Sequence, residues 1–315
     1  MEPVLYIFLI LVACGVLIKA VNAFIESSTI IAHHLNISTY TISFLIISIA
    51  TSLPELVVGI NSGLSGNPIL AYGAVIGSNI ALLTLVIAIP VLLGETLSTN
   101  TILYNKDAYL GALFTIMPLA MSIDGKLTRI DGLLLLSGYV IYFIAVLKRG
   151  SFFENLIEKF EHRNMWKQGT LFVGSLLVVL AASEVIVESA LNLSTLVALE
   201  LGFIGLSITA LGTSLPEIAY TVSASKRIHK DSALGDIIGS VIANSTAVLG
   251  TVAVIKPIII TNATVGLSSL TFLLFTILLF LRFVKTKETL DKKEALLLFV
   301  IYIAFIIFEY QMQLK

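Results

Sequence analysis

Two glutamates stand in matching surroundings in the two halves of the 315-residue chain. The sequence ATSLPE at residues 50–55 recurs as GTSLPE at residues 212–217, so the two copies lie 162 residues apart. In each copy the glutamate, Glu55 or Glu217, directly follows a proline inside an apolar segment. Proline lacks an N–H and clashes with the carbonyl four residues back, so each motif is predicted to break a helix and free a backbone carbonyl.

These motifs supply the kind of ligand that hard metal cations bind. Freed carbonyls, hydroxyls and carboxylates are all oxygen donors, which suit Ca²⁺, Mg²⁺, Mn²⁺ or Na⁺ and not soft metals. Glu55 and Glu217 at equal depth in two symmetric halves would together neutralise one divalent cation. The sequence therefore predicts a cation site where the two motifs meet.

A second repeated stretch follows each motif and adds a polar helix face in one half. The pattern G-x-x-I-G-S-x-I-A occurs at residues 73–81 and again at residues 235–243. In the second copy Asp236, Ser240 and Asn244 are four residues apart, so they lie along one stripe of a helix. Close helix packing explains the glycines, but it does not explain a buried Asp and Asn on one face. The corresponding first-half residues are Ala74, Ser78 and Leu82.

The elements that carry these motifs are predicted membrane spans. Hydrophobic residues make up 57% of the chain and charged residues 12%, with a mean hydropathy of +1.00. This composition excludes a soluble enzyme, because soluble domains average about 25% charged residues. The balance of 19 basic and 20 acidic residues excludes a nucleic-acid binder, and the single cysteine, Cys14, excludes a disulfide scaffold. Apolar windows predict an all-α polytopic membrane protein with ten transmembrane helices, near residues 4–24, 39–64, 69–93, 108–123, 128–147, 168–192, 202–225, 233–255, 264–283 and 293–311.

The repeat divides these spans into two sets of five. Because five is odd, the second set must enter the membrane from the opposite side, as in the inverted repeats of many secondary transporters. We expect a first repeat at residues 1–147, a cytoplasmic connecting loop at residues 148–167 and a second, inverted repeat at residues 168–315. Most Lys and Arg residues of the loops fall on the side of that connecting loop, so the positive-inside rule places both termini outside the cell membrane.

At these two motifs the sequence resembles the sodium/calcium exchanger group of the cation/calcium antiporter superfamily. The resemblance covers roughly residues 4–90 and 168–255 and implies that Glu55 and Glu217 are the central Ca²⁺-binding carboxylates. It further implies that Asn244 is a ligand. Backbone or side-chain oxygens are implied to bind Na⁺ or Ca²⁺ at Thr51, Ser52, Ser78, Thr213, Ser214 and Ser240.

The sequence departs from the family pattern at three positions. Leu82 stands where the first repeat of the family has Asn or Asp, and the Asn that the family usually has before the G-S pair is replaced by Ala74 in one half and by Asp236 in the other. Asn79 is not expected to replace the lost ligand, because three residues along a helix turn its side chain about 60° away from that of Leu82. The site is therefore predicted to have one fewer central ligand and an added charge at Asp236.

Together these features predict a secondary active antiporter that exchanges a divalent cation, Ca²⁺ in the first place, for Na⁺ by alternating access. Two alternatives remain: a divalent cation/H⁺ antiporter whose glutamates carry protons, and a gated cation channel, although channels usually build their pore from several subunits. An enzyme is not expected, since HExxH, GxSxG and phosphate-binding loops are lacking. The expected partners are the transported ions and the lipid bilayer, without a cofactor or nucleic acid.

Overall fold

The computed structural model describes residues 2–34, 51–97, 102–150, 165–196, 201–226, 231–260, 263–286 and 289–313. Almost all of these residues are helical, as the sequence predicts. The two strands found among them, β1 (Lys126–Leu127) and β2 (Ile258–Ile259), form one short antiparallel pair.

The helices of the first half lead from the N-terminus to the connecting region. They are α1 (Glu2–His34), α4 (Leu53–Leu64), α5 (Pro68–Ala81), the π-helical turn η2 (Leu82–Val86), α6 (Ile87–Leu92), α7 (Ile102–Met121), the 3₁₀ turn η3 (Ser122–Asp124) and α8 (Arg129–Gly150). The second half contains α9 (Met165–Leu196), α10 (Leu201–Ile204), the π-helical turn η5 (Gly205–Thr209), α11 (Ala210–Thr213), α12 (Leu215–Ser225), α13 (Asp231–Ala243), the π-helical turn η6 (Asn244–Val248), α14 (Leu249–Ile255), α15 (Ala263–Thr286) and α16 (Lys292–Gln313).

Corresponding elements of the two halves begin at the same spacing as the sequence repeat. α4 and α12 begin 162 residues apart, as do η2 and η6, and α6 and α14. Within the described ranges, six helical segments are long and apolar enough to cross a membrane. They are Pro68–Leu92, Arg129–Val146, Met165–Ala182, Gly202–Ser225, Ala233–Ile255 and Lys292–Met312. The chain is thus a helical membrane protein, while the full number of ten spans stays a prediction.

Helix α1 is longer than the sequence predicts. The predicted span ends at residue 24, but the helix continues to His34. Ser27 is accommodated within the helix, where its hydroxyl lies 2.9 Å from the carbonyl oxygen of Ala23 and 3.1 Å from that of Phe24 in the preceding turn. α9 is also longer than predicted, and most of the predicted 148–167 loop, residues 151–164, lies outside the described residues.

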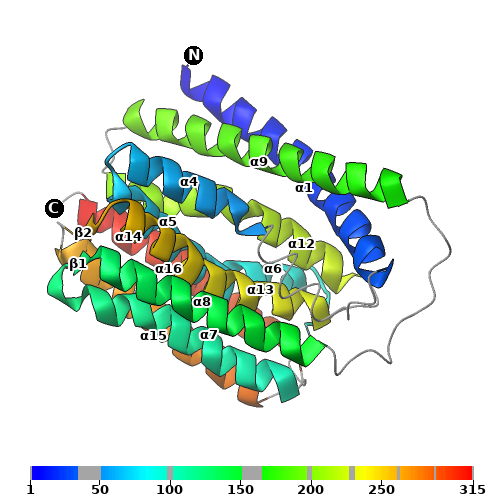
Figure 1. Cartoon of the computed structure of the whole chain (residues 1–315). Coiled ribbons are helices and arrows are strands. Elements are labelled where there is room, and N and C mark those ends of the chain that lie inside the picture. Colours follow the sequence, from blue (N-terminus) through cyan, green and yellow to red (C-terminus); the bar gives the residue numbers. More distant parts are fainter. Residues whose placement is uncertain are drawn as a thin grey trace.

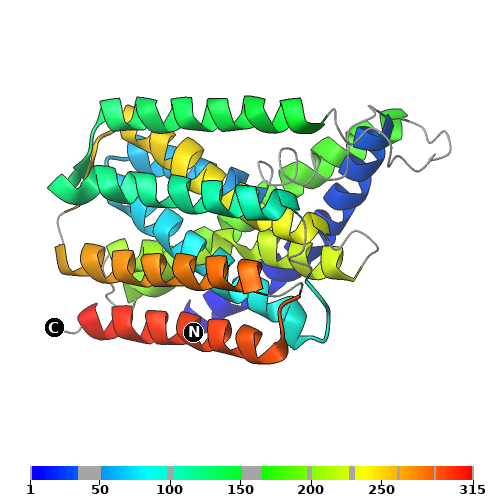
Figure 2. The same ribbon diagram turned by 90° about the horizontal axis from the view of Figure 1, so that it is seen from below.

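The helices form a buried centre with flanking pairs. In the span from Pro68 to Leu92, 89% of the residues of the most apolar window are buried inside the protein, against 22% for the span in α8. Helix α9 lies across α1 on one side, where the rings of Phe24 and Phe172 stand 4.9 Å apart (Figure 1). α15 and α16 run side by side at another edge (Figure 2). The central helices therefore carry the polar motifs away from lipid.

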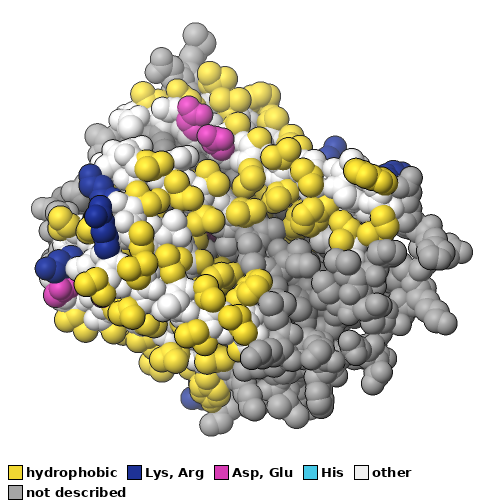
Figure 3. All heavy atoms as spheres, in the orientation of Figure 1, with side chains coloured by type: hydrophobic (Ala, Val, Ile, Leu, Met, Phe, Trp, Pro, Cys, Tyr) yellow, Lys and Arg dark blue, Asp and Glu magenta, His cyan; other side chains and the backbone are white. Residues whose placement is uncertain are grey.

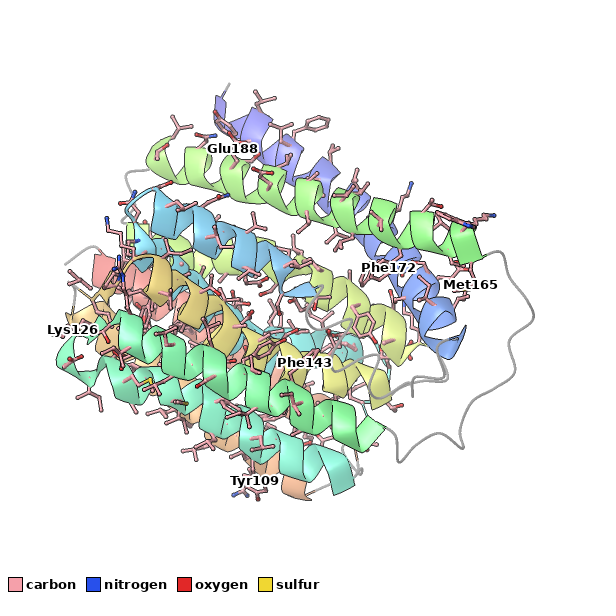
Figure 4. The ribbon with its side chains drawn as sticks, in the orientation of Figure 1. Tyr109, Lys126, Phe143, Met165, Phe172 and Glu188 are labelled. Carbon is pink, nitrogen blue, oxygen red and sulfur yellow. The ribbon has the colours of Figure 1, made fainter. Side chains whose placement is uncertain are left out.

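The outer surface agrees with a membrane environment. Hydrophobic side chains dominate the described part of the face in Figure 3, and Lys and Arg side chains stand near its margins. Lys126 and Met165 lie at opposite ends of the helix assembly, with the helices running between them (Figure 4). Lys167, two residues after Met165, is also exposed, so the apolar belt has charges at both ends, as expected for helices that cross a bilayer.

Close contact between α5 and the segment α10–η5 confirms the predicted role of the first-half glycines. A Cβ atom on Gly77 would lie 2.1 Å from the carbonyl oxygen of Leu206, and one on Gly73 would lie 2.7 Å from that of Gly202. Glycine at both positions allows the two backbones to touch. This contact brings the second stretch of the first half against the motif-bearing helix of the second half.

Candidate cation site

The second TSLPE motif breaks its helix as predicted, and the first motif begins a new helix at the corresponding position. In the second half α11 ends at Thr213 and α12 begins at Leu215, and Ser214 between them has φ −82° and ψ 0°. In the first half α4 begins at Leu53, after Ser52 in nearly the same conformation, while the preceding residues up to Ala50 lie outside the described residues. In both copies proline occupies the first turn of the new helix, where a missing N–H costs no intrahelical hydrogen bond.

Three carboxyl groups lie in the interior, those of Glu55 and Glu217 in the first turns of α4 and α12 and that of Asp236 within α13. The exposed fraction of the side chain is 2% for Glu55 and 0% for both Glu217 and Asp236. The three groups lie near enough to interact electrostatically with one another. Like charges buried together are strongly unfavourable without a compensating cation or proton. Glu55 and Glu217 thus lie near enough to interact, as predicted, and Asp236 adds a third buried carboxyl group whose charge needs a cation or a proton to offset it.

One hydrogen-bond cluster joins the halves at Ser78. The Ser78 hydroxyl donates to Glu55 Oε1 at 3.0 Å and contacts the hydroxyl of Ser214 at 2.8 Å. Because Ser78 has a single hydroxyl hydrogen, Ser214 is the donor in that second bond. Asn244 Nδ2 also donates to the Ser78 oxygen at 3.3 Å. Four predicted ligands from both repeats thus meet in one network.

A second cluster forms at Thr51. The Thr51 hydroxyl donates to Asp236 Oδ1 at 3.2 Å and contacts the Ser240 hydroxyl at 3.3 Å. Thr213, the counterpart of Thr51, instead donates to the carbonyls of Thr209 (3.0 Å) and Ala210 (3.3 Å) of its own helix. Every predicted ligand is buried, but the two halves of the site are not equivalent.

Several buried oxygens in these clusters have no hydrogen-bond partner. They are Ser52 Oγ, Glu55 Oε2, both carboxylate oxygens of Glu217, Asp236 Oδ2 and Asn244 Oδ1. A buried polar atom without a partner costs about 1–3 kcal/mol, and more if it is charged. An oxygen that accepts no hydrogen bond can instead coordinate a hard cation. Among the described residues no three His, Cys, Asp or Glu side chains are arranged to hold a metal, so hydroxyl, amide and carbonyl oxygens must complete any coordination shell.

The structure also shows polar residues that sequence reasoning missed. Asn79, fully buried, donates to the Ser245 hydroxyl at 2.8 Å and makes a second polar link between the repeats. It does not join the Ser78 cluster, in agreement with its predicted direction. Thr221 is also fully buried. Thr221 follows Glu217 by four residues, and residues at this spacing share a helix face, so the sequence could have predicted that Thr221 faces the same interior as Glu217.

Of the departures from the family pattern, Leu82 lies in a π-helical turn that is matched by a second turn in the other half, whereas Asp236 lies within α13. Leu82 is the first residue of η2 and Asn244 the first residue of η6. In each turn a threonine hydroxyl, from Thr84 or Thr246, donates at 2.5 Å to the carbonyl four residues back. π-helical turns inside α-helices occur often at functional sites. Leu82 is fully buried there and offers no oxygen, as the sequence indicates.

Comparison with known proteins identifies the family. Residues 5–148 and residues 168–311 each match the family described as Sodium/calcium exchanger protein. The chain belongs to the sodium/calcium exchanger family. Its two matches coincide with the two predicted repeats, so the resemblance seen at the motifs is confirmed. Membership makes the protein a membrane antiporter and not an enzyme.

Relatives of this exchanger match over nearly their full length. CaxA of Alkalimonas amylolytica is 31% identical over 280 residues, which cover 86% of this chain and 88% of CaxA. MaX1 of Methanosarcina acetivorans, a sodium/calcium exchanger by name, is 23% identical over 333 residues, covering 92% of this chain and 94% of MaX1. A solved structure of the sodium-calcium exchanger NCX_Mj, soaked with Na⁺ and Sr²⁺, matches with a TM-score of 0.77 at 27% identity, covering 96% of this chain and 97% of NCX_Mj.

Proposed function

We propose that this exchanger carries Ca²⁺ in one direction and Na⁺ in the other, using the buried oxygens around Glu55 and Glu217. One observation carries the proposal: two repeated helix breaks bring two buried glutamates together, and three of their four carboxylate oxygens have no hydrogen-bond partner. Two carboxylates match the charge of one Ca²⁺. When Na⁺ is bound instead, the neutral oxygens nearby can supply part of its coordination shell.

The remaining ligands of the proposal come from the helices that follow each motif. Ser78 contacts Glu55 and is itself contacted by Ser214 and Asn244, whereas Thr51, Ser240 and Asp236 form the other cluster. Ser52 and Thr213 complete the set at the helix breaks. Hydroxyl groups suit Na⁺, which needs fewer compensating charges than Ca²⁺. The same carboxylates must therefore serve both ions in turn, which is the basis of antiport.

The proposed architecture is ten spans in two inverted repeats at residues 1–147 and 168–315, which open alternately to either side. Reciprocal backbone contacts support it. β1 of the first half pairs with β2 of the second. In the reciprocal contact, the N–H of Leu290 in the second half donates to the carbonyl oxygen of Leu97 in the first at 3.4 Å. Leu97 is the repeat counterpart of Ile259 in β2, 162 residues earlier. Each half thus offers the same edge to the other, as a two-fold axis requires. Such an axis in the membrane plane relates the halves of many alternating-access transporters.

The proposed orientation has both termini outside and the loop at residues 148–167 in the cytoplasm. Lys126 and Lys167 are exposed and are assigned to opposite sides. In a Cys14→Ser background, a membrane-impermeant maleimide added to intact cells should label Lys126→Cys and leave Lys167→Cys unlabelled until the cells are opened. The reverse pattern would refute this orientation.

Exchange of a divalent cation for H⁺ is the second candidate. Asp236 favours it, because a third buried carboxyl group exceeds the charge of one Ca²⁺. The extra negative charge requires a proton or a monovalent cation when Ca²⁺ is bound. The family match favours an antiporter of either kind over a channel.

Flux measurements in proteoliposomes separate the two candidates. Vesicles loaded with Na⁺ and diluted into choline buffer with ⁴⁵Ca²⁺ should accumulate the isotope, because Na⁺ leaves down its gradient. Vesicles loaded with choline at acidic internal pH serve as the matched control. Equal uptake in the two preparations, or uptake with the proton gradient alone, would contradict Na⁺/Ca²⁺ exchange.

A further inference from the structure

A fourth buried carboxyl group lies outside the central clusters. Glu309 of α16 is fully buried, although most of the apolar window of that helix is not. Its Oε1 atom accepts hydrogen bonds from Ser268 at 2.8 Å and Ser269 at 2.9 Å, both on the neighbouring helix α15 (Figure 2). An ionisable residue inside a membrane helix is expensive and is usually functional.

The second carboxylate oxygen of Glu309, Oε2, has no hydrogen-bond partner. If the group is ionised, a buried negative charge lacks compensation, and no described basic side chain is found beside it. If the group is neutral, Oε2 still has no hydrogen-bond partner, whichever oxygen carries the hydrogen. Either state leaves a buried group unsatisfied, at a cost that a bound cation would remove.

We propose that Glu309, Ser268 and Ser269 bind a hard monovalent cation, with Na⁺ as the physiological candidate, between α15 and α16. A serine hydroxyl oxygen carries two lone pairs, so it can be a cation ligand as well as a hydrogen-bond donor. These lone pairs and Oε2 supply oxygen ligands, which hard cations prefer. One carboxylate compensates one positive charge, so a divalent ion would leave a buried charge unbalanced.

This site is separate from the exchange site and belongs to one repeat. None of the three central carboxyl groups interacts electrostatically with Glu309. The residues 162 positions before Glu309, Ser268 and Ser269 are Leu147, Lys106 and Asp107, which do not repeat the set. Ion exchange is proposed to use ligands from both repeats, whereas these three residues occur in one repeat. The ion they bind is therefore expected to stay in place and to hold α15 and α16 together. Binding to the folded state then stabilises the protein.

Equilibrium binding of ²²Na⁺ to the purified full-length protein in detergent tests the proposal. The Glu309→Gln variant should bind one fewer Na⁺ at saturation than the parent. The matched control, Glu188→Gln, removes an exposed carboxylate of α9 and should bind as many as the parent (Figure 4). Equal numbers of bound Na⁺ in Glu309→Gln and the parent would overturn the proposal and leave the carboxyl group as a helix-to-helix hydrogen-bond acceptor.

A second variant keeps the test decisive if Glu309→Gln does not fold. Replacing both serines by alanine retains the carboxylate and should weaken binding of this one ion about tenfold. The melting temperature of the parent should also rise when Na⁺ replaces choline at constant ionic strength, and the double variant should need more Na⁺ for the same rise. An unchanged Na⁺ dependence of melting and binding in the double variant would also overturn the proposal. Neither readout depends on Ca²⁺ transport, so this result is independent of the proposed exchange.

Discussion

Na⁺-driven ⁴⁵Ca²⁺ uptake by the Glu217→Gln variant is expected to fall about 100-fold or more below that of the parent. Removing one charged partner of a buried ionic contact costs about 3–5 kcal/mol, and each 1.4 kcal/mol corresponds to about a tenfold change in an equilibrium constant. Neither carboxylate oxygen of Glu217 has a hydrogen-bond partner in the protein. Glutamine keeps the shape of the side chain and removes only its charge, so the loss should come from ion binding.

Two comparisons make this result specific. Glu184→Gln removes an exposed carboxylate of α9 and should transport Ca²⁺ at the parental rate. Glu55→Gln should lose uptake as Glu217→Gln does, but it also disturbs the bond from Ser78, so its melting temperature should drop further. Parental uptake by a folded Glu217→Gln protein would disprove the assignment of this residue as a Ca²⁺ ligand.

The sequence was sufficient to predict the features that follow from local chemistry or exact repetition. The prolines of the TSLPE motifs predicted the breaks at Ser52 and Ser214, because a missing N–H interrupts a helix whatever surrounds it. The spacing of Asp236, Ser240 and Asn244 predicted a shared face because helix geometry fixes it. The common 162-residue spacing predicted that both halves repeat one set of elements.

Features that depend on tertiary contacts were not predictable in this way. The pairing of Asn79 with Ser245 joins positions whose repeat counterparts, Val241 and Leu83, are apolar, so the repeat gave no indication of it. The π-helical turns at Leu82 and Asn244 add a residue to one turn without any proline or glycine inside them. Likewise, the length of α1 depends on its packing against α9. Hydrophobic periodicity does not encode these contacts.

The position of the Ser78 cluster depends on how closely α5 approaches the second half. At Gly73 and Gly77 the helix touches the backbone of α10 and η5, and Gly205 on the other side would place a Cβ atom 2.6 Å from the carbonyl oxygen of Leu70. Backbone atoms cannot move aside as the end of a flexible side chain can. A larger residue at this contact must therefore separate the helices, and the cluster beside it with them.

Gly77→Ala is expected to lower the free energy of unfolding by about 3 kcal/mol, at the upper end of typical overpacking costs. Its Cβ would lie 2.1 Å from the Leu206 carbonyl oxygen, so α5 must shift. That shift moves the next residue, Ser78, away from the Ser214 hydroxyl of the second half, and Ca²⁺ uptake should fall although every proposed ligand is retained. The control is Gly174→Ala, where nothing lies within 4 Å of the added Cβ. Thermal unfolding followed by size-exclusion chromatography gives the melting temperature of both variants. If their melting temperatures and their rates of Ca²⁺ uptake are the same, the close approach of α5 does not set the geometry of the site.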